Sequence, residues 1–229
     1  MEHEATQREG LGGLAWQLGG PFIKRAIQRK YELFRRLVQP GPATRILDVG
    51  ATAQASAGFN FLERWYPWPE RITAVAHGRP DQFAAFSRRF PRVKLVLGDG
   101  RALPFADGAF DLVFSNGVLE HVGDQEDQRR FVAEALRVGR RCFLSTPNAG
   151  FPLDTHTMFP FVHYLPRAPR AWIYRHTGKQ NFAAPGSLDL LSERRLRALF
   201  PGEAQLQLVR PRTGGMVSTL VALASLEAA

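Results

Sequence analysis

Cysteine is almost missing from this sequence, which has only Cys142 among its 229 residues. A single cysteine excludes a disulfide within the chain and a cysteine-rich metal site. We interpret Cys142 as a small buried residue of a strand rather than as a nucleophile, because most free cysteines behave as small apolar side chains.

Long apolar runs are also missing. No run of about 18 or more apolar residues occurs, so the sequence predicts no membrane-spanning helix. The first residues, MEHEATQREG, lack the basic start and apolar core of a signal peptide, which favours a cytoplasmic location. The apolar fraction of 45% and the length predict one domain over residues 1–229, built around one core.

Acidic residues are outnumbered, with 21 Asp and Glu against 30 Lys and Arg and a net charge of +9. Such a charge suits an anionic partner, although richness in arginine can also reflect genome composition. Basic residues crowd an expected amphipathic helix, Pro21–Gln39, within an N-terminal extension of residues 1–44. We favour a helix that covers the sheet and has a solvated basic face. Contact with an anionic membrane or with nucleic acid is the alternative.

From residue 45 onward, strands and helices alternate. The expected strands are Arg45–Val49, Arg71–Ala76, Val93–Leu97, Phe110–Ser115, Arg141–Ser145, Gln205–Val209 and Val217–Ala224. The expected helices are Ala57–Trp65, Pro80–Phe90, Asp124–Leu136 and Ser192–Phe200. This alternation predicts an α/β fold with a doubly wound, mostly parallel sheet of seven strands. No helix separates the last two strands, so we expect them to form a C-terminal antiparallel hairpin.

Residues 147–190 interrupt the alternation. This insert is rich in proline and aromatic residues, and it holds basic but no acidic residues between Asp154 and Asp189. A long aromatic insert at the carboxyl edge of a sheet is typical of a substrate lid. His156 and His163 lie near Asp154, but their spacing fits no strong zinc pattern, so we predict no metal site.

Polar residues follow the expected strands, at the edge where open α/β sheets bind ligands. The fourth strand ends in Ser115 and Asn116, and Asp99 follows the third. Asp99 is suited to accept a hydrogen bond from an exocyclic amine, or else it caps a turn. His121 is a candidate general base, because imidazole titrates near neutral pH, and equally a candidate structural histidine.

Glycine is scarce where a nucleotide-binding turn would need it. After Gly50 the chain continues with small residues, and the next glycine is Gly58. A dinucleotide-binding dehydrogenase would carry a Gly-x-Gly-x-x-Gly motif at this turn, so its absence argues against that class.

Five short motifs resemble, in order and spacing, those of class I S-adenosylmethionine-dependent methyltransferases. They are Asp48-Val49-Gly50, Gly98-Asp99-Gly100, Leu103-Pro104-Phe105, Phe110-Asp111-Leu112-Val113 and Val118-Leu119-Glu120-His121-Val122. The resemblance is strong over residues 45–148 and is closest to enzymes that act on small molecules, lipids or sugars. It implies a Rossmann-like fold, with S-adenosylmethionine as the cofactor.

The resemblance also implies roles for single residues. The implied cofactor-binding residues are Asp48, Gly50, Ala51, His77, Asp99, Gly100, Ser115 and Asn116. Asp48 and Gly50 would shape the pocket for the methionine moiety, and Asp99 and Gly100 would lie at the adenine. Ser115 and Asn116 would line the floor near the sulfonium.

The sequence departs from the family pattern at two places. The glycine-rich loop is altered, and His77 stands where the family has an acid that accepts bonds from both ribose hydroxyls; Asp81 is the candidate replacement. However, Asn60-Phe61-Leu62-Glu63 and Tyr66-Pro67 resemble a branch of the family with a similarly altered loop. This favours a divergent but working enzyme.

We therefore expect methyl transfer to a small-molecule, sugar or lipid-like acceptor. Alignment of the acceptor alone can supply about 7–11 kcal/mol. His121 and His156 are the candidate catalytic residues, needed where the acceptor must lose a proton. The alternatives are a non-catalytic binding protein of the same fold and an RNA methyltransferase that uses the basic charge. The sequence predicts no particular oligomeric state.

Overall fold

The computed structural model describes residue 25 and residues 27–53 and 60–226. Seven strands form one sheet in the order β3-β2-β1-β4-β5-β9-β6. Their bounds are β1 Ile46–Val49, β2 Ile72–Ala76, β3 Lys94–Leu97, β4 Leu112–Asn116, β5 Cys142–Pro147, β6 Ala204–Val209 and β9 Thr219–Leu226. The expected strands are thus confirmed to within a few residues.

The first five strands pair in parallel, and β9 runs antiparallel between β5 and β6. The predicted fold class, including the antiparallel C-terminal pair, is confirmed. The last strand was expected to begin at Val217. Instead, β7 (Arg212–Thr213) and β8 (Met216–Val217) form a separate small hairpin before β9 begins.

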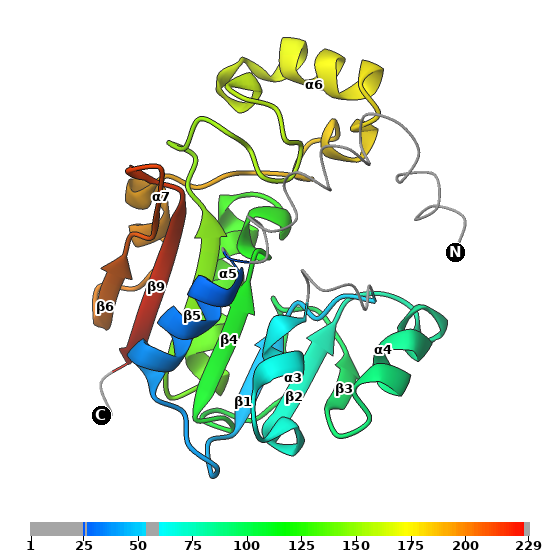
Figure 1. Cartoon of the computed structure of the whole chain (residues 1–229). Coiled ribbons are helices and arrows are strands. Elements are labelled where there is room, and N and C mark those ends of the chain that lie inside the picture. The colour runs from blue at the N-terminus through cyan, green and yellow to red at the C-terminus, as the bar shows by residue number, and fades with distance from the viewer. Residues whose placement is uncertain (1–24, 26, 54–59, 227–229) are drawn as a thin grey trace.

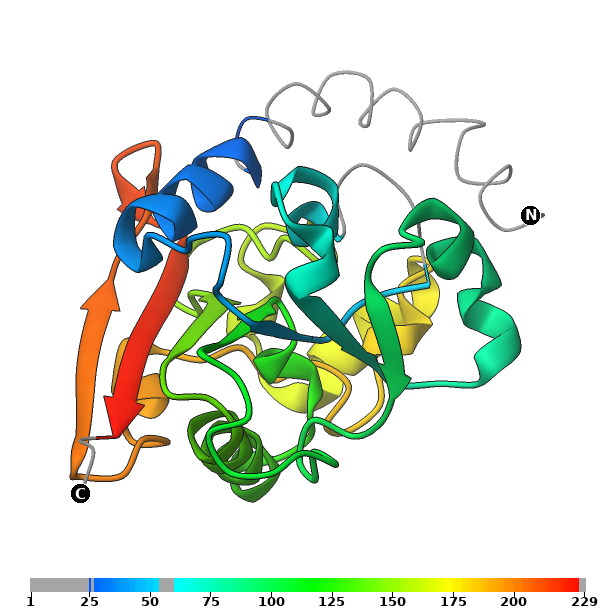
Figure 2. The ribbon, with the colours of Figure 1, turned by 90° about the horizontal axis from the view of Figure 1, so that it is seen from below.

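Helices cover both faces of the sheet (Figure 2). One face carries a helix over residues 27–38, together with α3 (Phe61–Trp65) and α4 (Ala84–Arg89). The other carries α5 (Gln125–Val138) and α7 (Glu193–Arg197). The expected N-terminal helix therefore exists, although residues 21–24 and 26 lie outside the described part, as do residues 57–59 of the helix expected before Trp65.

Alternation along each strand divides the core between the two faces. Ile46 joins the cluster that contains Phe34, whereas the next residue, Leu47, joins the cluster that contains Phe131 of α5. This period of two follows from the pleat of a strand. Cys142 is fully buried in β5, and burial raises the pKa of its thiol to about 12, which supports its interpretation as a core residue.

Helix α5 shows how local sequence sets these elements. Asp124 caps its start, and its carboxylate accepts hydrogen bonds from the backbone N–H groups of Glu126 and Asp127. Gly139 follows its end, where a Cβ atom would lie 2.6 Å from Cγ2 of Val113. The helix thus runs between a capping acid and a glycine that close packing requires.

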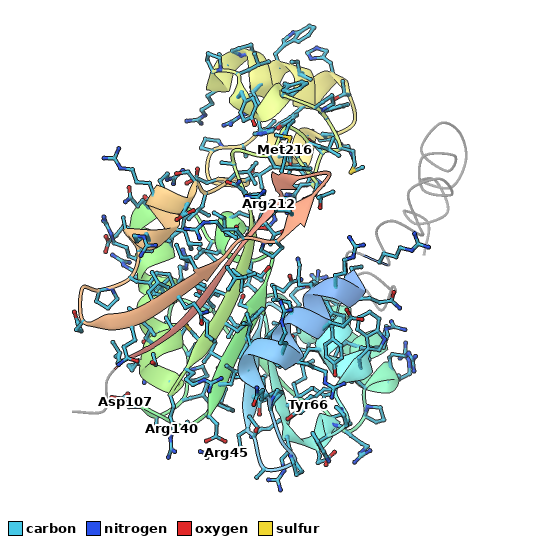
Figure 3. The ribbon with its side chains drawn as sticks, turned by 60° about the vertical axis from the view of Figure 1, so that its left-hand side comes forward. Arg45, Tyr66, Asp107, Arg140, Arg212 and Met216 are labelled. Carbon is cyan, nitrogen blue, oxygen red and sulfur yellow. The ribbon has the colours of Figure 1, made fainter. Side chains whose placement is uncertain are left out.

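The insert of residues 147–190 lies beyond the carboxyl ends of the parallel strands (Figure 1). It contains α6 (Arg167–His176), which was not expected, and the short 3-10 turns η4 (Val162–Tyr164) and η5 (Gln180–Phe182). Met216 and Arg212 of the β7–β8 hairpin lie beside the insert, whereas Arg45 and Arg140 mark the opposite end of the sheet (Figure 3). Among the described residues, none of the helices combines the length and the hydropathy that a membrane span requires.

Candidate functional site

The strand order reverses between β1 and β4, and α/β sheets bind ligands beyond the carboxyl ends of strands at such a point. Gly50, at the end of β1, has a φ of +112°, and a Cβ atom there would lie 2.1 Å from Cγ2 of Val118. The backbone N–H groups of Gly50 and Ala51 both donate to the carbonyl of Val75, at 2.9 and 3.0 Å. Only glycine fits this turn, which brings bare backbone to the edge of the sheet.

Two buried acids lie behind this turn. Burial raises the pKa of Asp48 well above its ordinary value, and the neighbouring carboxyl of Glu63 on α3 raises it further. Both side-chain oxygens of Glu63 are buried, and apart from the contact with the Asp48 carboxyl neither has a hydrogen-bond partner among the described residues. Unpartnered buried oxygens are costly, so they indicate a place for a donor such as an ammonium group. The sequence predicted Asp48 as a cofactor-binding residue, whereas it marked Glu63 only as the last residue of the motif that begins at Asn60.

Asp99 is held by an arginine two residues further on. Its carboxylate accepts from Nη2 of Arg101 at 2.6 Å, from Nε at 3.0 and 3.1 Å, and from the backbone N–H of Arg101 at 2.9 Å. These bonds hold the pKa of Asp99 below its ordinary value, despite partial burial. Arg101 also pairs with Asp127 at 3.0 Å. Asp99 is therefore an ionised acceptor fixed in one orientation.

The groups around Asp99 complete this side of the site. A Cβ atom on Gly100 would lie 2.5 Å from the Phe131 ring, so glycine is needed there for packing. His77, after β2, is exposed and contributes to the lowered pKa of Asp99. Asp81, the candidate replacement for the missing family acid, is exposed and pairs with Arg79 at 3.2 Å.

Ser115 and Asn116 end β4 with different partners. The Ser115 hydroxyl is buried and donates to the Val49 carbonyl at 2.8 Å, so it ties β4 to β1. Oδ1 of Asn116 accepts a hydrogen bond of 2.7 Å from Nζ of Lys30. Burial lowers the pKa of Lys30, and the charge of Glu120 acts against that shift. The expectation of a uniformly solvated basic face on the N-terminal helix is therefore wrong at Lys30.

The two candidate catalytic histidines meet at the boundary between the sheet and the insert. Their rings lie 4.7 Å apart at an angle of 83°. Nδ1 of His121 lies 2.8 Å from the Ser187 carbonyl oxygen. In His156, Nδ1 lies 3.2 Å from Asp154 and Nε2 lies 3.3 Å from Glu120. The fold thus joins residues that are far apart in the sequence.

Charge around His156 decides its protonation. Burial disfavours the imidazolium, but the carboxylates of Asp154 and Glu120 outweigh it and raise the pKa of His156 to about 9. Burial likewise acts against ionisation of Asp154, yet bonds from His156 and Thr157 lower its pKa to about 2. At neutral pH His156 therefore carries a proton already, which a general base must first lose.

Two cavities lie within the insert and its base. One, of about 230 Å³, is lined by residues that include His163, Tyr174 and Asp189. The other, of about 290 Å³, is lined by residues that include Arg167 and Phe182. The insert also exposes a set of apolar side chains, each at least 40% accessible: Met158, Phe161, Tyr164, Leu165 and Trp172. Neither cavity is lined by residues of β1–β4.

The strand order, with polar groups gathered where it reverses, is typical of α/β domains that bind nucleotides. Residues 47–141 match the family described as a methyltransferase domain. Over these residues the chain is similar to the class I S-adenosylmethionine-dependent methyltransferases, in agreement with the resemblance of its motifs. S-adenosylmethionine is the cofactor of this family.

Named proteins show the same likeness. The chain is 32% identical over 135 residues to a demethylmenaquinone methyltransferase of Mycolicibacterium paratuberculosis. This alignment covers 57% of this chain and 54% of that protein. It is 37% identical over 76 residues to a probable S-adenosylmethionine-dependent methyltransferase of Mycobacterium tuberculosis. That alignment covers 33% of this chain and 25% of the other protein. The chain thus aligns with about half the length of the first relative and a quarter of the second.

Among solved structures, the N-methyltransferase NodS of Bradyrhizobium japonicum, in complex with S-adenosylhomocysteine, superimposes with a TM-score of 0.54. The match covers 88% of this chain and 87% of NodS at 17% identity. At that identity the likeness concerns the fold alone, and it agrees with the sheet topology described above.

Proposed function

We propose that this chain transfers a methyl group from S-adenosylmethionine to a small-molecule or lipid-like acceptor. The observation that carries the proposal is the convergence of polar groups from β1, β3 and β4 where the strand order reverses. Together with the family match, this convergence fits a bound nucleoside better than it fits a plain structural edge.

The residues present fit the cofactor. Gly50 offers backbone where any side chain would collide, and the buried carboxyl groups of Asp48 and Glu63 lie together, where they would accept hydrogen bonds from the methionine ammonium. Asp99 and Gly100 would hold the adenine, as the family resemblance implies, and Asp99 is ionised and oriented for that role. When bound, the cofactor supplies an electrophilic methyl group.

The insert supports an apolar acceptor. Phe161, Tyr164 and Trp172 of the insert expose apolar surface. Such surface favours contact with an apolar acceptor over contact with a strongly polar one. The name of the first relative, demethylmenaquinone methyltransferase, supports a lipid-like acceptor as well. The work of the chain would be to align the acceptor, exclude water and hold Asn116 in place through Lys30.

Labelled methyl transfer tests this function. The full chain is incubated with methyl-labelled S-adenosylmethionine and three acceptors in parallel: a long-chain quinol in detergent, a water-soluble phenol and a short RNA. We expect label in the quinol first. Label confined to the RNA would overturn the acceptor class. Firm binding of S-adenosylhomocysteine without transfer to any acceptor would favour the non-catalytic alternative.

A further inference from the structure

Glu120, His121 and His156 each place one metal-binding atom within 4.8 Å of the other two. Glu120 and His121 belong to η3 (Leu119–His121), which follows β4, and His156 lies in the insert, which follows β5. Because β4 and β5 are neighbouring parallel strands, the segments after them meet at the same edge. The spacing along the sequence does not indicate this cluster, since it forms only when the sheet forms.

Both imidazoles are oriented by an oxygen close to one ring nitrogen, Nδ1. Nδ1 of His121 lies 2.8 Å from the Ser187 carbonyl, and Nδ1 of His156 lies 3.2 Å from Asp154. Asp154 is itself fixed, since it accepts a bond of 2.7 Å from Thr157. Metal-binding histidines almost always donate their second ring N–H to a carbonyl or a carboxylate, and Nε2 then binds the ion. At His156 the ion would take the place of the Nε2 proton, which is released on binding.

Glu120 completes the cluster with a buried carboxylate. The side chain is fully buried, and Oε2 accepts a bond of 2.9 Å from Thr146. No described group makes a hydrogen bond of good geometry to Oε1, which lies 3.3 Å from Nε2 of His156. Two ligands of a tetrahedral ion, each about 2.1 Å from it, are about 3.4 Å apart. That pair of atoms therefore already has the separation of two ligands.

We propose that Glu120, His121 and His156 bind a divalent first-row transition-metal ion of the zinc type. Two imidazole nitrogens and one carboxylate suit zinc, iron or manganese, whereas magnesium and calcium prefer ligand sets made of oxygen alone. Three protein ligands also leave a position open, as in catalytic rather than structural zinc sites.

The surroundings of the cluster include an aromatic ring. Phe182 lies 6.4 Å from the His121 ring and 6.0 Å from the His156 ring, so an aromatic side chain of the insert borders the cluster. Water, or a hydroxyl of the acceptor, would fill the position. That last role rests on the proposed methyl transfer, whereas metal binding itself rests only on the geometry.

Calorimetric titration of the chelator-treated, tag-free chain with zinc chloride alone tests the site. We expect one equivalent of zinc to bind. Asp154→Asn, which removes the support of one ligand, should weaken binding by about 10- to 100-fold. Glu120→Gln and His156→Ala, which remove ligands, should weaken it further. His176→Ala is the matched control, because this exposed insert histidine lies outside the cluster, and it should bind zinc like the wild type.

Folding of the variants is checked separately through thermal unfolding. Zinc should raise the unfolding temperature of the wild type and of His176→Ala, but not that of His156→Ala. Zinc binding that is unchanged in all cluster variants, or no binding to the wild type, would overturn the site. A magnesium affinity equal to that for zinc would contradict the proposal that imidazole nitrogens bind the ion. Each titration is repeated with S-adenosylhomocysteine, so that a failed metal site and a failed methyltransferase assignment give different results.

Discussion

Lys30 donates a hydrogen bond of 2.7 Å to Oδ1 of Asn116, and this bond joins the N-terminal helix to the end of β4. Burial lowers the pKa of Lys30, and the charge of Glu120 partly opposes this lowering. Hydrogen bonds from a charged donor such as lysine are stronger than those between neutral groups. The helix over residues 27–38 therefore supplies part of the proposed site as well as part of the core.

Replacement of Lys30 by methionine tests that link. The variant keeps a long apolar stem but leaves the Asn116 carbonyl oxygen without its donor, so the amide loses its fixed orientation. We expect the affinity for S-adenosylhomocysteine to fall by about 10-fold, as is typical for one charge-assisted hydrogen bond. Arg29→Ala, an exposed residue of the same helix, is the control. An unchanged affinity in Lys30→Met would show that Asn116 needs no such support.

Gly50→Ala should disrupt the first turn for two separable reasons. The backbone has a φ of +112°, and the new Cβ atom would lie 2.1 Å from Cγ2 of Val118. We expect a loss of about 2–4 kcal/mol in the free energy of unfolding, measured by urea titration. Val118→Ala in the same chain should recover about 1 kcal/mol by removing the collision but not the strain. Gly202→Ala, which has no close neighbour, should be near neutral; equal losses at both glycines would contradict this.

The pair between Asp99 and Arg101 gives the protein a specific dependence on pH. Because the folded-state pKa of Asp99 is lowered, its contribution to stability is present above the unfolded-state value of about 3.9 and is lost as the pH falls through the folded-state value. Asp99→Asn should therefore be less stable than the wild type at pH 7. We expect a difference below about 1 kcal/mol, because both side chains are 37% exposed.

Urea unfolding at neutral pH and at several values below about pH 4 measures this difference. The free energies of unfolding of the wild type and Asp99→Asn should converge as the pH falls. Asp81→Asn is the control, since its ion pair with Arg79 is highly exposed and should contribute little at any pH. A difference that stays constant with pH would show that the carboxylate charge does not matter there.

Arg195 anchors the end of the insert. Its guanidinium binds both carboxylate oxygens of Asp189, at 2.9 and 2.5 Å, and the backbone N–H of Asp189 donates to the Glu120 carbonyl at 2.8 Å. Arg195→Ala should speed hydrogen exchange over residues 182–190 while the exchange of β1 and β4 is unchanged. Arg194→Ala, at the exposed neighbour, should have no effect. Uniformly faster exchange in Arg195→Ala would indicate global destabilisation instead.

The fold was predictable because its signals are local. Alternation of apolar residues marks the strands, and features such as Asp124 before α5 and Gly139 after it mark the helices. Helix α6 was missed because it begins after Pro166, contains Pro169 and buries only Ala171 and Tyr174. Few buried positions leave a weak periodic signal, so a short helix of the insert is hard to read from sequence.

The site was predictable only in part. Gly50 and Asp99 follow strands and Asn116 ends one, so their place at the edge is set by the topology. By contrast, the inward direction of Lys30 depends on how its helix crosses the sheet, and the approach of His156 to Glu120 depends on the path of the insert. Contacts between distant segments leave no trace in spacing or composition.

Calorimetric titration with S-adenosylhomocysteine tests the methyltransferase assignment most directly. It is made on the wild type and on Asp99→Ala, which removes the acceptor that we propose for the adenine. We expect binding of one equivalent with micromolar affinity in the wild type and a clear loss of affinity in the variant. No binding to the wild type up to millimolar concentrations would contradict the assignment and favour a binding protein that keeps only the fold.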